Sequence, residues 1–396
     1  MPALPPHSPL VISASRATDI PAFHGEWFMA RLRAGFCRRR NPFNSRQESL
    51  ISFARTRVFV FWSKHSSPFL PHLAEIAPTG RQFYFQYTLN AYEAEGLEPG
   101  LPSLCRRLET FKRLADTIGP QRVIWRCDPL IVGGRLSTDA LLERIDRLGR
   151  ELSPYTEKLV FSFVDMYRKT AAALQRLDPA YRAPTVDEMR ELARGIATLN
   201  AGWPHRLELA TCAEGIDLSA LGIHKNKCID DVLIRRLCPQ DALVQAELAP
   251  RRQLSLLPGM ETAASVSKDT GQRTACGCIP SKDIGAYDSC PHFCVIATPT
   301  VRSRRCAPTF CAAASRRKYG RACWADIFIA RPFRHPDRPV CCSLSSGLWR
   351  LPVSRPTAPA GSLRPPSAPA VRVRSLLTCP ASSNSRSLPA FPTAPA

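Results

Sequence analysis

Residues 101–129 read LPSLCRRLETFKRLADTIGPQRVIWRCDP and contain one complete helix-to-strand unit. Apolar residues recur at helical spacing through 101–118, and Gly119 stands where such a helix would end. The short apolar run 123–126 follows, and it is rich in residues that favour strands. Polar residues and Pro129 come directly after this run. The stretch therefore predicts a helix that leads into a buried strand.

The same alternation recurs through the first 215 residues. Strands are predicted at residues 10–15, 58–63, 83–89, 123–126, 159–164 and 207–211, and helices at 26–34, 68–76, 101–118, 138–152 and 186–200. Helix starts are predicted at Asp19, Ser137 and Thr185, and helix stops at Gly35, Gly119 and Gly202. Such βα units indicate an α/β fold with a parallel sheet. We expect a complete or partial (β/α) barrel, with a doubly wound open sheet as the alternative. After about residue 216 the alternation is expected to stop.

Polar residues stand at the carboxyl ends of the predicted strands, where βα barrels place their chemistry. The residues expected to line a pocket there are Arg16, Asp19, Lys64, Arg126, Asp128 and Asp165. Arginine and lysine suit a carboxylate or phosphate group, and aspartate accepts hydrogen bonds from a ribose or an amine. The alternative is structural: helix caps, turns and, between Arg126 and Asp128, a local ion pair.

Composition limits the class of protein. The chain has 396 residues, 44% of them hydrophobic, enough for one large domain or two ordinary ones. It has no run of eighteen apolar residues, and residues 1–10 lack the pattern of a secretory signal. We therefore expect a cytoplasmic protein without a membrane span.

The net charge of +21 is unevenly distributed along the chain. Residues 296–396 hold 16 Lys and Arg against 2 Asp and Glu, a net of +14, which leaves +7 for residues 1–295. This last segment is rich in Arg, Pro, Ser and Ala and shows no helix or strand period, so we expect a disordered tail that binds polyanions without specificity. Residues 1–9 are expected to be disordered and residues 10–295 to form the α/β domain.

The 16 cysteines indicate metal or redox chemistry, because disulfides are rare in a reducing compartment. They are densest in CGCIPSKDIGAYDSCPHFC at residues 276–294, the cysteine-rich end of the domain.

Several blocks of sequence, in order, resemble the uncharacterised DUF1848 family over residues 10–295. The blocks are ISASRATDIP (12–21), RNPFN (40–44), FWSK (61–64), FQYT (85–88), ETFK (109–112), GPQRVIWRCDP (119–129), TCAE (211–214), KCID (227–230) and the segment 276–294. The resemblance implies an iron–sulfur protein of radical-SAM type, with a [4Fe–4S] cluster and S-adenosylmethionine as cofactors. Such an enzyme would need an electron donor and a substrate, small or macromolecular, that the resemblance does not name.

In the family pattern, three cysteines spaced C-x3-C-x2-C hold the cluster and leave one iron open for S-adenosylmethionine. Cys290 and Cys294 fill the first two places, and Ala297 occupies the third. Alanine cannot ligate iron, so the resemblance implies that the motif is disrupted in this chain and that any enzyme activity is impaired.

Four further cysteines match family positions: Cys212, Cys228, Cys276 and Cys278. Four thiolates suffice for a second cluster or for a zinc ion. The alternative is a set of buried free thiols. His224 and His292 are possible additional ligands.

The sequence after Val295 matches a shifted reading frame. The family pattern reads C-P-H-G-C-x-Y-C-Y-A-N, whereas this chain continues Ile-Ala-Thr-Pro-Thr at 296–300. If the codons were TAT TGC TAC GCC AAC A, deletion of the first T gives ATT GCT ACG CCA ACA, which encodes the observed residues. We therefore expect residues 296–396 to be translated out of frame.

Three functions follow as hypotheses. The first is a radical-SAM-like iron–sulfur enzyme, impaired in this copy. The second is a non-catalytic zinc or iron–sulfur module held by the four further cysteines. The third is a nucleic-acid binder driven by the basic tail, whose affinity would fall steeply with salt.

Overall fold

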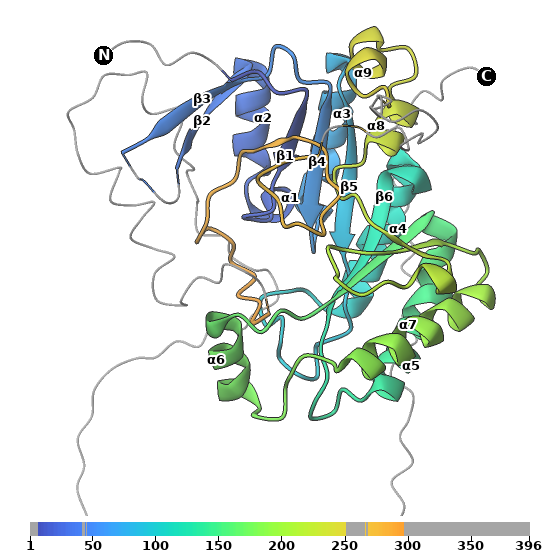
Figure 1. Cartoon of the computed structure of the whole chain (residues 1–396). Coiled ribbons are helices and arrows are strands. Elements are labelled where there is room, and N and C mark those ends of the chain that lie inside the picture. Colours follow the sequence, from blue (N-terminus) through green and yellow to red (C-terminus); the bar gives the residue numbers. More distant parts are fainter. Residues whose placement is uncertain (1–6, 42–43, 45, 251–265, 267, 297–396) are drawn as a thin grey trace, which may run out of the picture. The chain divides into compact units, whose positions relative to one another are not determined.

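The computed structural model describes residues 7–41, 44, 46–250, 266 and 268–296 (Figure 1). The segments expected to be disordered, residues 1–9 and 296–396, lie outside this part except for residues 7–9 and 296. Ala297 also lies outside it.

The described residues contain one large sheet in which every pairing is parallel. Its strands are β1 (Val11–Ala14), β4 (Val58–Ser63), β5 (Gln82–Thr88), β6 (Val123–Leu130), β7 (Lys158–Phe163), β8 (Glu208–Thr211), β9 (Ile223–Lys225) and β10 (Lys282–Asp283). The strand order is β10-β1-β4-β5-β6-β7-β8-β9. The predicted α/β class with a parallel sheet is confirmed.

The strand order distinguishes the two predicted architectures. From β1 to β9 each strand of the sheet pairs with the next one along the chain, as in a (β/α) barrel. A doubly wound sheet would instead reverse direction at a switch point. Within the described residues no pairing joins β9 to β10, so the arrangement is that of a partial barrel with these two strands at its edges.

The helices connect the strands and begin and end largely where the sequence predicts. They are α1 (Ile20–Phe23), α2 (Gly25–Ala34), α3 (Leu73–Ile76), α4 (Leu104–Ile118), α5 (Thr138–Leu152), α6 (Arg168–Leu177), α7 (Val186–Ala201), α8 (Asp231–Leu237) and α9 (Ala242–Glu247). The side chains of Asp19, Ser137 and Thr185 cap α1, α5 and α7 as predicted. The helix predicted at 68–76 begins instead as a 3₁₀ helix over Ser67–His72, which contains Pro68 and Pro71.

Some elements differ from the prediction. The βα alternation continues after residue 216, because β9 and α8 form one further unit. A hairpin of β2 (Phe36–Arg40) and β3 (Glu48–Ser52) follows α2, and α6 follows β7. The expectation that the alternation stops is therefore wrong, since a three-residue strand such as β9 gives too short an apolar run to detect.

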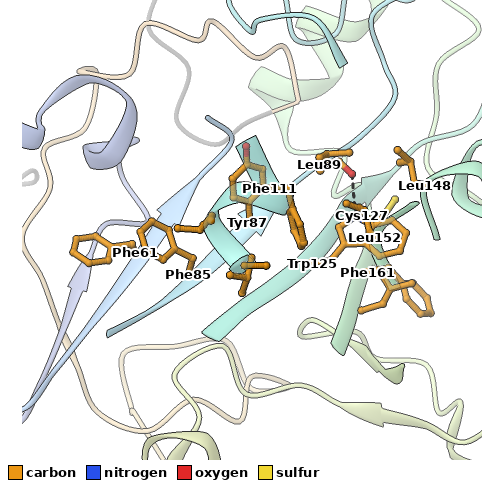
Figure 2. Packing of buried hydrophobic residues seen from close by; sticks show 14 of the residues in the cluster. Phe61, Phe85, Tyr87, Leu89, Phe111, Trp125, Cys127, Leu148, Leu152 and Phe161 are labelled. Atoms are coloured by element: carbon orange, nitrogen blue, oxygen red, sulfur yellow. Dashed lines mark hydrogen bonds between the residues drawn. The ribbon is translucent and has the colours of Figure 1, made fainter. Parts of the chain in front are cut away.

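The two faces of the sheet carry different cores. On one face, aromatic residues such as Phe61, Phe85 and Trp125 pack under α2, α4 and α5 (Figure 2). On the other face, Val58 and Tyr84 pack against α8, α9 and the segment before β10. The second core includes Cys228, Cys276 and Cys278. These three cysteines lie in the segments that follow β9 and precede β10, and they pack against the strand side chains of this second face.

Gly149 of α5 lies against the indole ring of Trp203. A Cβ at this position would come within 2.0 Å of that ring, which is buried and donates a hydrogen bond to Asp146. We expect Gly149→Ala to lower the free energy of unfolding by about 1–2 kcal/mol, because overpacking outweighs the better helix propensity of alanine. Urea unfolding checks this. Gly215→Ala is the control, since nothing lies within 4 Å of its added methyl group; equal losses in both variants would contradict the prediction.

Candidate functional site

A cavity of about 400 Å³ opens at the carboxyl ends of the strands. It is lined by residues at or just after the carboxyl ends of β1, β4, β5, β6 and β8 and by the cysteine-rich segment. The predicted site residues that line it are Arg16, Asp19, Lys64, Asp128, Cys212, Cys228, Cys276, Cys278, Cys290, Cys294 and His292. The fold thus brings together side chains from both ends of the domain.

Asp19 lies at the centre of one wall. Its carboxylate accepts hydrogen bonds from the backbone N–H groups of Ala22 (2.9 Å) and Lys64 (2.7 Å) and pairs with His292 Nε2 at 2.9 Å. Burial alone would raise the pKa of Asp19, but these hydrogen bonds and the His292 ring hold that pKa below its ordinary value. Asp19 is therefore an ionised carboxylate whose partners are all supplied by the protein.

Arg126 and Asp128 form a buried ion pair on the neighbouring wall. Asp128 also accepts a hydrogen bond from Ser162, and Arg126 Nη1 lies 3.0 Å from Cys228 Sγ. Burial opposes ionisation of Asp128, yet the charge of Arg126 lowers the pKa of that carboxyl. Arg126 itself does not line the cavity but supports it from behind, next to one of the cysteines.

Lys64 reaches a partner that the sequence analysis did not single out. Its Nζ lies 2.6 Å from Glu98, a buried residue of the loop between β5 and α4. Asp165 lies two residues beyond the end of β7, where it is exposed and pairs with Arg273 at 2.6 Å. Asp165 is therefore not a lining residue, whereas Arg273 is one.

Cys212, Cys228, Cys276 and Cys278 meet as one group, called here the four-thiol group. The sulfurs of Cys212 and Cys228 are 3.4 Å apart, and the side chain of Cys278 forms hydrogen bonds with those of Cys228 and Cys276. The hydrogen bond with Cys278 lowers the pKa of Cys276 to about 6. The surroundings therefore favour the thiolate form of Cys276, which is the form that binds metals.

No set of three or more His, Cys, Asp or Glu side chains in the described part of the chain has the spacing of a metal-holding group. The cysteines would have to shift to surround an ion. His224 lies on β9 with its side chain exposed and does not line the cavity, so it is not brought to the cysteines.

Cys290 and Cys294 lie in the loop that follows β10, on the side of the cavity nearest Asp19 and Lys64. Burial raises the pKa of Cys290 to about 11 and that of Cys294 to about 12, so both are neutral thiols. Ile296 packs into the main core beyond them.

The family model described as "Domain of unknown function (DUF1848)" matches residues 11–296. The chain belongs to this family. No curated protein and no solved structure matches the chain. Among the described residues of this DUF1848 protein, no helix is both long and apolar enough to cross a bilayer.

Trp62 is a further lining residue of the DUF1848 cavity that the sequence analysis missed. The guanidinium groups of Arg16 and Arg126 lie 5.1 and 5.3 Å from its ring centroid, and its Nε1 donates to Ser13 at 3.1 Å. Its position at the end of a predicted strand, two residues before Lys64, was the available signal. No such signal marked Glu98 in the sequence, because this residue lies in a loop that has no periodic pattern.

His65 follows Lys64 in the chain and makes the free energy of unfolding depend on pH. Desolvation lowers the pKa of His65 to about 4. Between pH 6.5 and about 4 the unfolded chain binds a proton that the folded chain does not, so stability falls as the pH falls. We expect His65→Gln to reduce the loss of unfolding free energy between pH 7 and pH 5 by about 1 kcal/mol. Urea midpoints at both pH values measure it, and His205→Gln, at an exposed histidine, is the control. An unchanged pH profile would show that His65 does not contribute.

Proposed function

We propose that this DUF1848 chain is an iron–sulfur protein whose metal centre is held by the four-thiol group. The observation that supports this most is the convergence of four cysteines from three separate segments onto one cavity. Four thiolates are the usual ligand set of an iron–sulfur cluster. The cysteines that line the cavity are free thiols, which is typical of a reducing compartment, and we propose the cytoplasm.

The surroundings of the thiols support a negatively charged centre. Arg126 Nη1 and Asn226 Nδ2 lie 3.0 and 3.2 Å from Cys228 Sγ, and the Ile229 N–H donates to Cys278 Sγ at 3.4 Å. Hydrogen bonds to ligand sulfurs stabilise thiolates and tune the potential of a cluster. A group of packing cysteines would not need these donors.

A single zinc ion is the second candidate, and the distance between one pair of sulfurs is closer to what zinc requires. Two thiolates on one zinc, each about 2.3 Å from the metal in a tetrahedron, lie about 3.8 Å apart. The 3.4 Å between Cys212 and Cys228 is a few tenths of an ångström shorter than this. The cysteines of a [4Fe–4S] cluster bind four different irons, so their sulfurs must lie farther apart. Such a structural zinc site would make the module non-catalytic.

The three-cysteine cluster that would bind S-adenosylmethionine does not fit this chain. Cys290 and Cys294 supply two thiols, and the third place of the sequence motif is Ala297, which has no group that ligates iron. We therefore assign no radical step to the chain as it stands. Our proposal is that a one-nucleotide deletion after Val295 removed the third ligand.

Metal content tests the four-thiol site. Full-length protein is reconstituted anaerobically with iron and sulfide, and separately with zinc, and bound metal is counted by mass spectrometry. We expect about one centre per chain in the wild type and at least a tenfold lower affinity in Cys228→Ser, which removes a ligand. Cys238→Ser is the control, because Cys238 is a buried thiol that does not line the cavity. Binding of zinc but not iron selects the second candidate, and binding of neither would overturn both.

A chain with its reading frame restored tests the disrupted motif. We expect this version, in which Tyr and Cys replace Ile296 and Ala297, to bind about four more irons per chain than the present chain, since a third thiolate completes the family motif. The control is the restored chain carrying Cys294→Ser, which should lose the added iron. Equal iron in the present and restored chains would contradict the deletion as the cause of the loss.

A further inference from the structure

The charged side chains that line the cavity are almost all neutralised by partners within the protein. Asp19 pairs with His292, Lys64 with Glu98, Asp128 with Arg126 and Arg273 with Asp165. Arg16 differs, because within the described residues no carboxylate lies within ion-pair distance of its guanidinium. The cavity therefore carries at this position one positive charge that is not in an ion pair, although the Asp283 carboxylate attracts it from a greater distance.

The structure holds Arg16 in place without an ion pair to its guanidinium. Its backbone N–H donates to the Asp283 carboxylate at 2.8 Å, and its guanidinium lies 5.1 Å from the centroid of Trp62. Its Nη2 is buried and has no hydrogen-bond partner in the described part of the chain. Leaving a buried donor unpaired costs about 1–3 kcal/mol, more when the group is charged. Native proteins carry few such groups, so each calls for a partner.

Two further lining residues also have a buried polar atom without a hydrogen-bond partner. The Oγ1 of Thr18 and the Nδ1 of His292 are buried and without partners in the described residues. Both residues line the cavity that Arg16 lines. Three unsatisfied polar atoms around one cavity indicate a ligand that offers hydrogen-bond acceptors or donors to each of them. A cavity of about 400 Å³ lies in the range of small-molecule sites.

We propose that the cavity binds a small organic anion whose acidic group, a carboxylate or a phosphate, pairs with Arg16. The planar guanidinium matches both groups in a two-pronged arrangement. Thr18 and His292 hydrogen-bond the remaining polar atoms of the ligand, and the rings of Trp62 and Phe293 contact its apolar part. This site goes beyond the proposed metal centre and does not require it.

The rival explanation is that Arg16 balances the charge of the four-thiol group. The charges of Cys278 and Cys228 act on Arg16 and, against desolvation, raise its pKa. The two explanations differ in what they predict. A counter-charge leaves no place for an added anion, whereas a ligand site binds one in the presence and in the absence of metal.

Calorimetric titration of the full-length chain separates them, before and after removal of metal with a chelator. The probes are inorganic phosphate, succinate and the neutral succinamide. We expect phosphate or succinate to bind with a dissociation constant of 1 mM or lower in both states, and succinamide at least tenfold more weakly. The better of the two anions identifies the acidic group. Arg16→Gln should weaken anion binding at least tenfold. Arg16→Lys should weaken it less, since lysine keeps the positive charge but loses the planar guanidinium that can donate two parallel hydrogen bonds.

The control variant is Arg190→Gln, at an exposed arginine of α7, which should bind like the wild type. Thermal unfolding confirms that each variant is folded, so that loss of binding is not loss of structure. Anion binding that is unchanged in Arg16→Gln would overturn the proposal. A wild type that binds neither anion in either state would also overturn it. If Arg16→Gln then holds less metal, Arg16 is a counter-charge for the thiols. Failure of metal binding alone leaves this site standing.

Discussion

The Asp19 carboxylate accepts hydrogen bonds from three segments of the chain. It caps α1 through Ala22, fixes the end of β4 through the Lys64 N–H and holds the cysteine-rich segment through His292. A buried carboxylate is stable only when its oxygens are satisfied in this way. The position of the final segment, and with it the cavity wall that carries Cys290 and Cys294, depends on this one group.

Most other charged side chains around the cavity are also satisfied by partners within the protein. Buried ion pairs such as Arg126–Asp128 and Lys64–Glu98 contribute little net stability, because desolvation offsets their attraction. They do fix side chains in one geometry, and they leave the cavity with a defined set of groups that are not satisfied internally. These are the thiols of the four-thiol group and the guanidinium of Arg16.

Local patterns predicted most of the framework. The alternation of apolar strands and amphipathic helices indicated the parallel sheet, and Asp19, Ser137 and Thr185 marked helix starts that the structure confirms. Strand periodicity and helix caps are encoded by residues close together in the chain, where they act directly. The grouping of Cys212, Cys228, Cys276 and Cys278 was implied instead by the resemblance to the DUF1848 family.

The features that sequence did not reveal depend on distant partners. β10 has two residues and exists because it pairs with β1. Glu98 is part of the site because a loop carries it to Lys64, and no local pattern marks it. Asp165 seemed equivalent to Asp128 in the sequence, yet it lies beyond the strand end and faces solvent. Closure of the barrel could not be inferred either, because periodicity carries no information on strand order.

The pairing of β1 with β10 also bears on how the protein is made. Ser13 and Asp283, which join these strands, are 270 residues apart. During synthesis the outer edge of β1 therefore stays open until almost the whole domain has left the ribosome, and an open edge invites pairing with other chains. Closing so long a loop costs little more entropy than closing a shorter one. The main consequence of the long separation is therefore a delay in strand pairing and not a loss of stability in the folded protein. The cysteine-rich segment is synthesised last, and the four residues of β1 stay unpaired on this edge until it arrives.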